Sequence, residues 1–468
     1  MKRDMSQIVL DRDLIRKYGT RGPRYTSYPT ADRFIEAFDA GSFRHWLEHR
    51  SVGGLSKPLG LYVHIPFCDT ACWYCACNRI ATRDRSHAVR YLKYLDREME
   101  LLSRSAGGAE IQQMHWGGGT PTYLSEHQIE ELVLRLEANF RFAPGCERSI
   151  ELDPRRVGNG TVALLADLGF NRVSIGVQDF APEVQRAVNR VQSMKQTLAV
   201  IDAARASRFR SINLDLMYGL PRQTRAGFGA TLDRVLECAP DRIALYSYAH
   251  LPAQFKPQRR IADADLPSPE VKLQLMLEAM RRLGEAGYVH IGMDHFARPE
   301  DDLAQAQNQG RLVRNFQGYS ASGDLDTLGV GVSSISQIGP AYSQNVKTLD
   351  EYFHKLDAGK LPVWRGLELT RDDLARRAVI QALACHFAVS IESINIAHLI
   401  DFHSYFSEEI KRLEPLTDDG LIEIDADWIT VTPSGRLLVR AICMVFDRYL
   451  REREDREADG RTRYSAVV

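Results

Sequence analysis

The chain of 468 residues is long enough for about three domains, or for one large domain with an appendage. Apolar residues make up 44% of the chain, which suffices for a full core. The positive charges of 60 Lys and Arg nearly cancel the negative charges of 61 Asp and Glu. This balance excludes a general attraction to nucleic acid. The N-terminal residues lack a secretory apolar core and no apolar run is long enough to span a bilayer, so we expect a cytoplasmic protein without a membrane partner.

Residues 1–55 are expected to form an N-terminal arm, with a short helix over Asp11–Tyr18. The segment Arg24–Thr30 combines arginine, two tyrosines and a proline, which predicts an ordered, extended piece. Two roles remain open for it, a place near the functional site and simple packing against the domain that follows.

Residues 56–368 begin with an alternation of strand and helix patterns. The six predicted strands are Leu61–Ile65, Gln113–Trp116, Ser149–Leu152, Val173–Val177, Ile212–Met217 and Ile243–Tyr248. Ser125 and Gln128 form a capping-box pattern that predicts the start of one intervening helix. Repeated βα units predict a parallel sheet, and six are too few to close an eight-stranded barrel, so we expect an α/β fold with a partial (β/α)6 barrel.

Four of the eight cysteines follow the first strand in the order Cys68-x3-Cys72-x2-Cys75-x-Cys77, on a loop at its carboxyl end. Three closely spaced thiolates suit a [4Fe-4S] cluster in which one iron stays open to another ligand. Zinc is the alternative, but a closed zinc site usually adds a second pair of ligands far away in the chain. The other cysteines stand singly in apolar contexts and are expected to be buried structural thiols: Cys146, Cys238, Cys385 and Cys443.

The ends of the later strands carry further candidate ligand-binding residues. Gly117–Thr122 follows the second strand, and its glycines would let the backbone approach a ligand; a phosphate cradle is the generic alternative, but the Walker lysine is missing. Glu151 ends the third strand, where a carboxylate in a barrel mouth needs a cationic or hydrogen-bonding partner. A salt bridge to a barrel arginine is the structural alternative for Glu151. His64, alone on an apolar strand, is either a core histidine or a residue beside the cluster.

Residues 369–468 are expected to form a separate C-terminal domain. Helical patterns over Arg371–His386 and Ser407–Leu413 precede a hairpin pattern around Asp425–Asp427. This order resembles a winged helix, a module that often binds DNA. Its basic residues are offset by acidic ones, so we expect no nucleic-acid partner and a supporting role for the domain.

The cysteine spacing resembles that of the radical S-adenosylmethionine superfamily, and further strings narrow the resemblance to oxygen-independent coproporphyrinogen III oxidases. These strings, in chain order, are Arg24–Thr30, Tyr62–Cys68, Cys77-Asn78, Gly292–Ala297 and Asn315–Tyr319. The resemblance covers nearly the whole chain, and it implies a partial barrel of the radical S-adenosylmethionine type.

The resemblance also implies roles for individual residues. It implies that Cys68, Cys72 and Cys75 bind a [4Fe-4S] cluster and that the site takes two molecules of S-adenosylmethionine. Residues implied to contact these molecules are Tyr62, Tyr74, Gly118, Gly119, Thr120, Glu151, Gln178, Arg190, Asp215, Ala249 and Ile335. Tyr74 stands where the family often has phenylalanine, and Cys77 and His64 are implied to serve catalysis.

The implied reaction is the anaerobic oxidative decarboxylation of two propionates of coproporphyrinogen III to vinyl groups, which gives protoporphyrinogen IX for haem synthesis. The implied mechanism is hydrogen abstraction by a 5′-deoxyadenosyl radical. Flavodoxin or ferredoxin would supply electrons, and a monomer is expected. Candidate partners for the propionates are Arg24, Lys256, Arg259, Arg260 and Arg298. Two other classes remain: a related haem chaperone, which typically lacks the fourth cysteine and the arm, and a zinc-bearing DNA-binding protein, which leaves six βα units unexplained.

Overall fold

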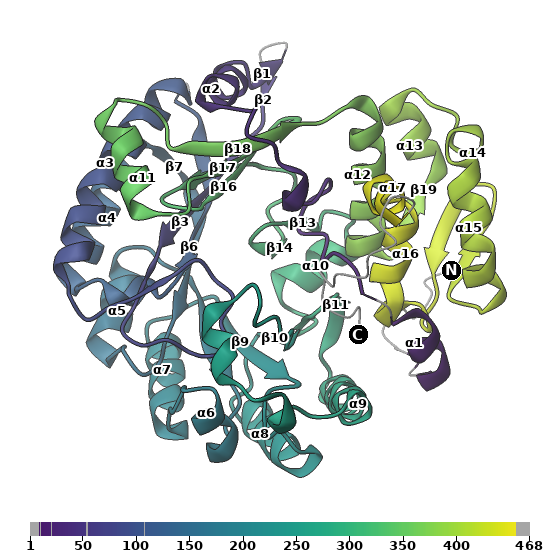
Figure 1. Ribbon diagram of the computed structural model, residues 1–468, viewed down its shortest axis with the longest axis horizontal. Coiled ribbons are helices and arrows are strands. Elements are labelled where there is room, and N and C mark those ends of the chain that lie inside the picture. The colour runs from purple at the N-terminus through teal and green to yellow at the C-terminus, as the bar shows by residue number, and fades with distance from the viewer. Residues whose placement is uncertain (1–8, 10, 20, 53–54, 107, 455–468) are drawn as a thin grey trace. The chain divides into compact units, whose positions relative to one another are not determined.

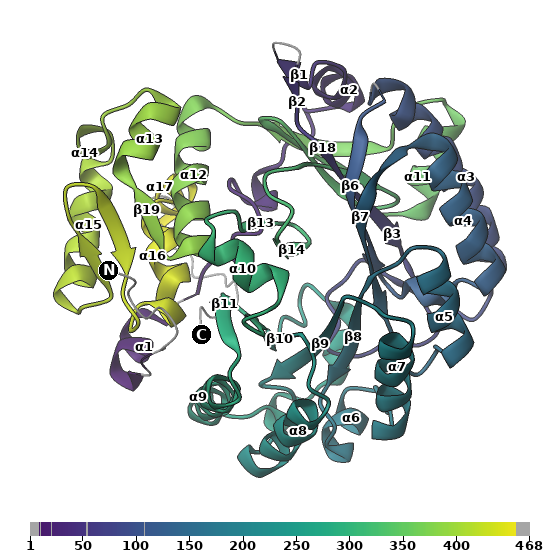
Figure 2. The ribbon, with the colours of Figure 1, turned by 180° about the vertical axis from the view of Figure 1, so that it is seen from behind.

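The computed structural model describes residues 9, 11–19, 21–52, 55–106 and 108–454 (Figures 1 and 2). The chain divides into two compact units. The sheet unit comprises residues 34–279 and 324–368, and the helical unit comprises residues 1–33, 280–323 and 369–468. The units differ from the three consecutive segments expected, because residues up to 33 and residues 280–323 group with the C-terminal region.

The sheet unit is built on ten strands in the order β10-β9-β8-β7-β6-β3-β15-β16-β17-β18. Their bounds are β3 Leu59–Ile65, β6 Glu110–Gly118, β7 Arg141–Leu152, β8 Arg172–Gln178, β9 Ser211–Tyr218, β10 Arg242–Ser247, β15 Asp326–Val330, β16 Ile335–Ile338, β17 Ala341–Asn345 and β18 Val363–Glu368. All six predicted strands are confirmed, and β3 and β6 to β10 pair in parallel and in chain order. Their carboxyl ends therefore meet at one edge of the sheet.

Helices connect these parallel strands and cover one face of the sheet (Figures 1 and 2). The α-helices of the sheet unit are α2 Ala40–Glu48, α3 Ser86–Ser105, α4 Glu126–Asn139, α5 Asn159–Asp167, α6 Pro182–Ala187, α7 Met194–Ala206, α8 Arg225–Glu237 and α11 Leu349–Asp357. The predicted capping box is present at α4, where Ser125 and Gln128 exchange hydrogen bonds. Fully buried strand residues such as Leu61, Ile150 and Leu214 form the core beneath the helices.

Four further strands lie at one side of this sheet, beyond the six predicted from the sequence. β15 pairs in parallel with β3, and β16, β17 and β18 follow as antiparallel neighbours. β15 and β17 are buried along their whole length, and such strands lack the polar–apolar alternation that identifies a half-exposed strand. The partial barrel therefore continues beyond its six βα units.

Short elements complete the sheet unit. They are β1 Ser51–Val52, β2 Leu55–Ser56, β4 Phe67–Cys68, β5 Ile80–Ala81, and the 3-10 helices η2 Pro121–Tyr123, η3 Lys256–Arg260 and η4 Asp263–Asp265. Helix α9, Pro269–Glu285, leads out of this unit. No helix in the described ranges is long and apolar enough to cross a membrane.

The helical unit contains short strand pairs and a bundle of helices. Its elements are α1 Arg12–Tyr18, η1 Ala31–Arg33, β11 Val289–Gly292, β12 His295–Ala297, α10 Asp302–Asn308, β13 Val313–Asn315, β14 Gly318–Ser320, α12 Arg371–His386, β19 Ala388–Ser390, α13 Ile391–His398, α14 Phe402–Tyr405, α15 Ser407–Asp418, β20 Ile422–Ile424, β21 Trp428–Val431, η5 Arg436–Leu438, α16 Val439–Val445 and α17 Arg448–Glu454. The order of helices and the sheet β19-β21-β20 agree with the expected winged-helix-like domain.

The N-terminal arm is divided between the two units: its residues up to Arg33 belong to the helical unit, and its residues from Phe34 belong to the sheet unit. Tyr25 and Tyr28 are buried in one core with residues of α12 and α16. The Tyr25 hydroxyl donates a hydrogen bond to Asp447 at 3.0 Å, so the arm is fixed by polar contacts as well as by apolar packing.

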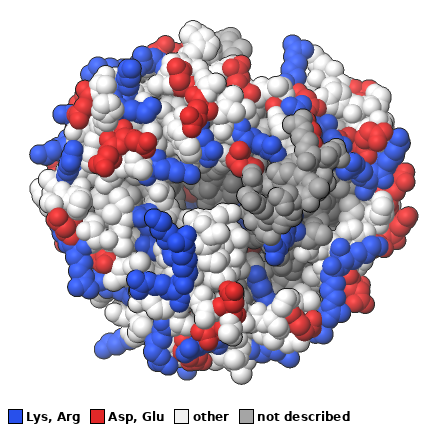
Figure 3. All heavy atoms as spheres, viewed as in Figure 1, with Lys and Arg blue, Asp and Glu red and all other residues white. Residues whose placement is uncertain are grey.

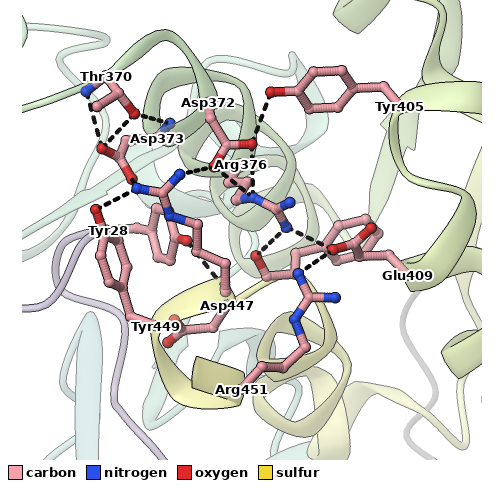
Figure 4. Close-up of polar contacts among 12 residues, drawn as sticks. Tyr28, Thr370, Asp372, Asp373, Arg376, Tyr405, Glu409, Asp447, Tyr449 and Arg451 are labelled. Carbon is pink, nitrogen blue, oxygen red and sulfur yellow. Dashed lines mark hydrogen bonds and ion pairs between the residues drawn. The ribbon is translucent and has the colours of Figure 1, made fainter. Parts of the chain in front are cut away.

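Buried charges connect α12, α15 and the start of α17 (Figure 4). The Arg376 guanidinium donates to Asp372 at 3.0 Å and to Glu409 at 2.8 Å, and Arg451 pairs with Glu409 at 2.5 Å. Glu409 is 2% exposed, so removal of Arg376 would leave a buried carboxylate with less compensation. The network fixes the last described helix to the bundle.

Candidate functional site

A cavity of about 330 Å³ lies at the carboxyl ends of β6 to β10 in the sheet unit. Twelve of the sixteen predicted site residues line it: Cys68, Cys72, Tyr74, Cys75, Cys77, Gly118, Gly119, Thr120, Glu151, Gln178, Arg190 and Asp215. The remaining four, Tyr62, His64, Ala249 and Ile335, are not among its lining residues. The structure thus joins residues from five strand ends and the cysteine loop around one space.

The cysteine loop is closed at its base by β4 and β5, which pair in parallel. The Ile80 N–H donates to Pro66 at 2.7 Å and the Thr82 N–H donates to Cys68 at 2.9 Å, so the loop begins and ends at the same place. Cys68 and Cys72 are buried, Cys75 is half-buried and Cys77 is exposed, and all four thiols are free.

Hydrogen-bond donors from outside the cysteine loop approach two of the three predicted cluster ligands. The Thr120 hydroxyl lies 3.4 Å from Cys68 Sγ, and Arg155 and Arg190 each place a guanidinium nitrogen 3.7 Å from Cys72 Sγ. Positive donors of this kind stabilise thiolate ligands and tune the potential of iron–sulfur clusters. Among the described residues no three His, Cys, Asp or Glu side chains are arranged to hold a single metal ion. The residues present fit a multi-iron cluster.

Asp153 holds the two arginines in place. Its carboxylate accepts from Arg155 at 2.6 Å and from Arg190 at 3.3 Å. Burial opposes its ionisation, but the hydrogen bonds from Arg155 and the charge of Arg190 outweigh burial and lower the pKa of Asp153 to about 2. Sequence reasoning missed Asp153 and Arg155, although their place directly after a predicted strand is a signal that could have identified them.

Cys77 lies beside a predicted cluster ligand. A hydrogen bond from the Cys77 thiol, stronger than the opposing effect of burial, lowers the pKa of Cys75 to about 6. The same contact raises the pKa of Cys77 well above that of a free thiol, so Cys77 keeps its proton next to the cavity.

Gly118 and Gly119, at the end of β6, lie so close to neighbouring atoms of the protein that a side chain would collide at either position. Gly118 has φ +113°, and a Cβ there would lie 2.6 Å from the His64 ring. A Cβ on Gly119 would lie 2.7 Å from the Phe67 carbonyl oxygen. The close approach seen here is within the protein, to His64 and to the start of the loop that carries the cysteines, and the expected approach of a ligand stays a prediction.

His64 lies behind the cavity wall. It is 5% exposed; its Nε2 lies 3.0 Å from the Asn78 carbonyl and its Nδ1 lies 3.0 Å from the Tyr62 hydroxyl. Burial lowers the pKa of His64, which favours a neutral ring that donates to Asn78 and accepts from Tyr62. In this position His64 fixes the end of the cysteine loop, and its implied role in catalysis stays a prediction.

Two carboxylates face the cavity from adjacent parts of the sheet. Glu151 lies 3.5 Å from His115 Nε2 and pairs with no arginine in the described structure, so the salt bridge considered as an alternative is absent there. Asp215 accepts hydrogen bonds from Ser174 at 2.9 Å and Asn213 at 2.8 Å. Burial, helped by the charge of Glu151, raises the pKa of Asp215 to about 7.

The remaining predicted residues occupy different surroundings. Gln178 has φ +67° at an irregularity that ends β8, which turns its side chain to the cavity lining. Arg190 donates to the Gly176 carbonyl at 2.6 Å. Ala249 follows β10 and Ile335 begins β16, so their expected ligand contacts stay predictions. The structure adds lining residues that the sequence did not indicate: Asp69, Thr70, Arg79, Arg156, Ser174 and Tyr246.

Comparison with known proteins agrees with this geometry. Residues 62–235 match the model of the Radical SAM superfamily, and residues 369–438 match that of the HemN C-terminal domain. Oxygen-independent coproporphyrinogen III oxidase of Pseudomonas aeruginosa is 50% identical over 99% of this chain and 100% of its own length, and that of Escherichia coli is 49% identical over 96% and 97%.

A solved structure extends the likeness to three dimensions. It is that of coproporphyrinogen III oxidase (HemN) from Escherichia coli, a radical SAM enzyme, with a TM-score of 0.90 and 48% identity over 95% of this chain and 100% of that chain. The superfamily uses a [4Fe-4S] cluster and S-adenosylmethionine, the groups that the cysteine loop and its cavity fit. The chain belongs to the family of oxygen-independent coproporphyrinogen III oxidases.

Proposed function

We propose that the protein converts coproporphyrinogen III to protoporphyrinogen IX without oxygen, as an oxidoreductase of haem synthesis. Two propionate side chains become vinyl groups; each loses one hydrogen atom from its β-carbon, one electron and one molecule of carbon dioxide. The observation that carries this proposal is the meeting of three cysteines, a glycine turn and two carboxylates in one cavity, in a chain similar over its whole length to enzymes of this name.

The roles of the cysteines and carboxylates follow from their chemistry. Cys68, Cys72 and Cys75 hold the cluster and leave one iron open, and the bound cluster with S-adenosylmethionine supplies the hydrogen-abstracting chemistry. Glu151 and Asp215 lie where carboxylates can attract the sulfonium and ammonium groups of the cofactor.

The number of cofactor molecules is part of the proposal. Glu151 and Gly118, on neighbouring strands, serve one molecule of S-adenosylmethionine. Gln178, Arg190 and Asp215, on the other side of the cavity, serve a second. Tyr74, Gly119 and Thr120 complete the lining through contacts with the same ligands.

Cys77 provides a thiol that is exposed and next to the cluster ligands. We assign it to proton supply or positioning during turnover. Arg156, at the cavity rim and 43% exposed, is a partner for a propionate. The five basic residues that the sequence suggested as partners for the propionates do not line the cavity: Arg24, Lys256, Arg259, Arg260 and Arg298.

The proposed cellular setting follows from the cofactors. A reduced one-electron donor such as flavodoxin or ferredoxin supplies electrons, and the protein acts as a cytoplasmic monomer. The eight unpaired cysteines support a reducing compartment.

An anaerobic assay tests the proposal against the haem-carrier alternative. The reconstituted protein is incubated with S-adenosylmethionine, dithionite and coproporphyrinogen III, and vinyl products are quantified with methionine release. We expect two decarboxylations per substrate molecule in the wild type. Tight haem binding without any vinyl product would overturn the enzyme assignment, which the full-length relatives support over the haem carrier.

A further inference from the structure

Seven exposed basic side chains form a collar around the outer side of the cysteine loop. The basic collar consists of Arg83, Arg85, Arg156, Arg186, Lys256, Arg259 and Arg260. Figure 3 shows Lys and Arg side chains gathered left of centre on the face where these segments lie in Figure 1. The four segments that carry the collar, residues 68–85, 153–156, 183–190 and 256–260, hold ten Lys and Arg and four Asp and Glu. The whole chain has a net charge of −1, so this excess is local.

Three contacts bring α6 and its following turn against the cysteine loop. The Trp73 N–H donates to the Val188 carbonyl at 2.9 Å, and Asn189 Nδ2 donates to the Ala71 carbonyl at 2.8 Å. Arg190, next in the chain, reaches Cys72 Sγ. Arg186 is thereby placed beside the outer side of the loop.

The other collar segments are fixed to the same loop. Gln258 Nε2, in η3, donates to the Tyr74 carbonyl at 3.0 Å, and the Arg260 guanidinium lies 5.9 Å from the centre of the Trp73 ring. Arg156 and Arg85 both pair with Asp69, at 3.3 Å and 2.7 Å. The collar is therefore one built surface and not a set of unrelated charges.

Acidic residues close to the collar are few or already paired. Asp69 is occupied by two arginines. Asp265 pairs with Arg222 at 3.3 Å, and Asp263 lies 3.0 Å from His250 Nε2. Asp84 accepts from the N–H of Ser86 at the start of α3. A positive field remains around Trp73, the residue next to a predicted cluster ligand.

We propose that the basic collar is the docking site of a small acidic protein that carries one electron. This inference rests on the proposed function, which needs such a donor. One electron passes from the reduced carrier, which is oxidised, to the cluster, which is reduced, through the segments that pack on the cysteine loop at Cys72 and Trp73. A small, charged and transient interface is typical of electron-transfer partners, and complementary charge accelerates their encounter.

The position of the collar separates this role from substrate binding. Of its seven members only Arg156 lines the cavity, so the others have no place in the contacts of a ligand held there. They surround the outer side of the loop whose inner side carries the cluster ligands. An anionic porphyrinogen in the cavity would meet Arg156, whereas an acidic protein would meet the whole collar.

Charge removal tests the proposal with holoenzyme and a reduced bacterial flavodoxin as the probe. The test variant is Lys256→Gln, Arg259→Gln and Arg260→Gln combined. The matched control removes one Lys and two Arg that are exposed near the amino ends of the strands, by Lys57→Gln, Arg104→Gln and Arg141→Gln. Stopped-flow bleaching of the cluster absorption gives the reduction rate, and titration with oxidised flavodoxin gives the dissociation constant.

We expect the test variant to be reduced by flavodoxin about tenfold more slowly than wild type at low salt, with a weaker dissociation constant, and the difference to vanish at high salt. Reduction by dithionite should be unchanged in both variants, and the control should resemble wild type with flavodoxin. Equal slowing in test and control, or no slowing in the test variant, would overturn the proposal.

Two further measures keep the outcomes distinct. If the test variant loses iron, a second variant that combines Arg83→Gln with Arg186→Gln removes two collar charges without changing η3. Its rate of reduction by flavodoxin is then compared with the rates of the wild type and the control. No porphyrinogen is present in either measurement, so failure of vinyl formation would count against the proposed function and not against the docking site.

Discussion

Asp215 gives the site a measurable response to pH. Burial first, and the charge of Glu151 second, raise the pKa of Asp215 from 3.8 to about 7, while donors from Ser174 and Asn213 act in the opposite direction. S-adenosylmethionine carries a positive sulfonium, so it should bind the ionised carboxylate and lower its pKa again. Affinity should then fall as pH drops through 7, because binding requires a proton to leave.

The magnitude follows from that pKa. With a value of about 7, roughly one Asp215 in eleven is ionised at pH 6 and roughly ten in eleven at pH 8. If the ligand selects the ionised form, the dissociation constant should be about tenfold higher at pH 6 than at pH 8, which corresponds to about 1.4 kcal/mol.

Equilibrium binding of S-adenosylmethionine to anaerobic holoenzyme at pH 6, 7 and 8 measures this response. Asp215→Asn should bind more weakly at pH 8 and lose the dependence on pH. Glu151→Gln, the matched control, should also bind more weakly but keep the dependence with its midpoint at lower pH, since one source of the raised pKa is gone. A wild-type dissociation constant that is flat from pH 6 to 8, or a slope that persists in Asp215→Asn, would refute the reasoning.

Three other changes are open to direct measurement. Changing any one of Cys68, Cys72 and Cys75 to alanine should lower iron content and the visible charge-transfer absorption, because three thiolates are the minimum for this cluster; full iron in one variant would remove that residue from the ligand set. Cys77→Ser should keep iron content but lose most vinyl product, and retention of both would make Cys77 a packing residue. Burial raises the pKa of Glu98 from 4.5 to about 7, so the folded protein retains a proton that the unfolded chain releases. The contribution of Glu98 to stability should therefore be fully present below pH 4.5 and fall by up to about 3 kcal/mol as pH rises to 7. In urea unfolding of the apo-protein, Glu98→Gln should lose this part of the pH dependence, and equal slopes in the two proteins would contradict the prediction.

Local sequence patterns sufficed for the six parallel strands and the cysteine loop. Strand patterns such as Ile212–Met217 are short runs rich in apolar residues, and a side chain at the end of each strand must reach the shared carboxyl edge. Glu151 was identified in this way, whereas Asp215 was implied by the family resemblance, and both line the cavity. The spacing of Cys68, Cys72 and Cys75 is equally local, because one short loop brings the thiols together.

The sequence by itself therefore determined the βα architecture and the cysteine loop, since each depends on residues close together in the chain, and the family resemblance supplied most of the cavity lining. Only the tertiary structure decided the strands β15 to β18; of these, β15 and β17 are buried along their whole length, which hides the periodicity of a strand. Contacts between distant segments could not be predicted either: Asp153 orients Arg190 toward Cys72, and Tyr25 packs in one core with residues of α16. Such pairs are set by long-range packing, which no local pattern encodes.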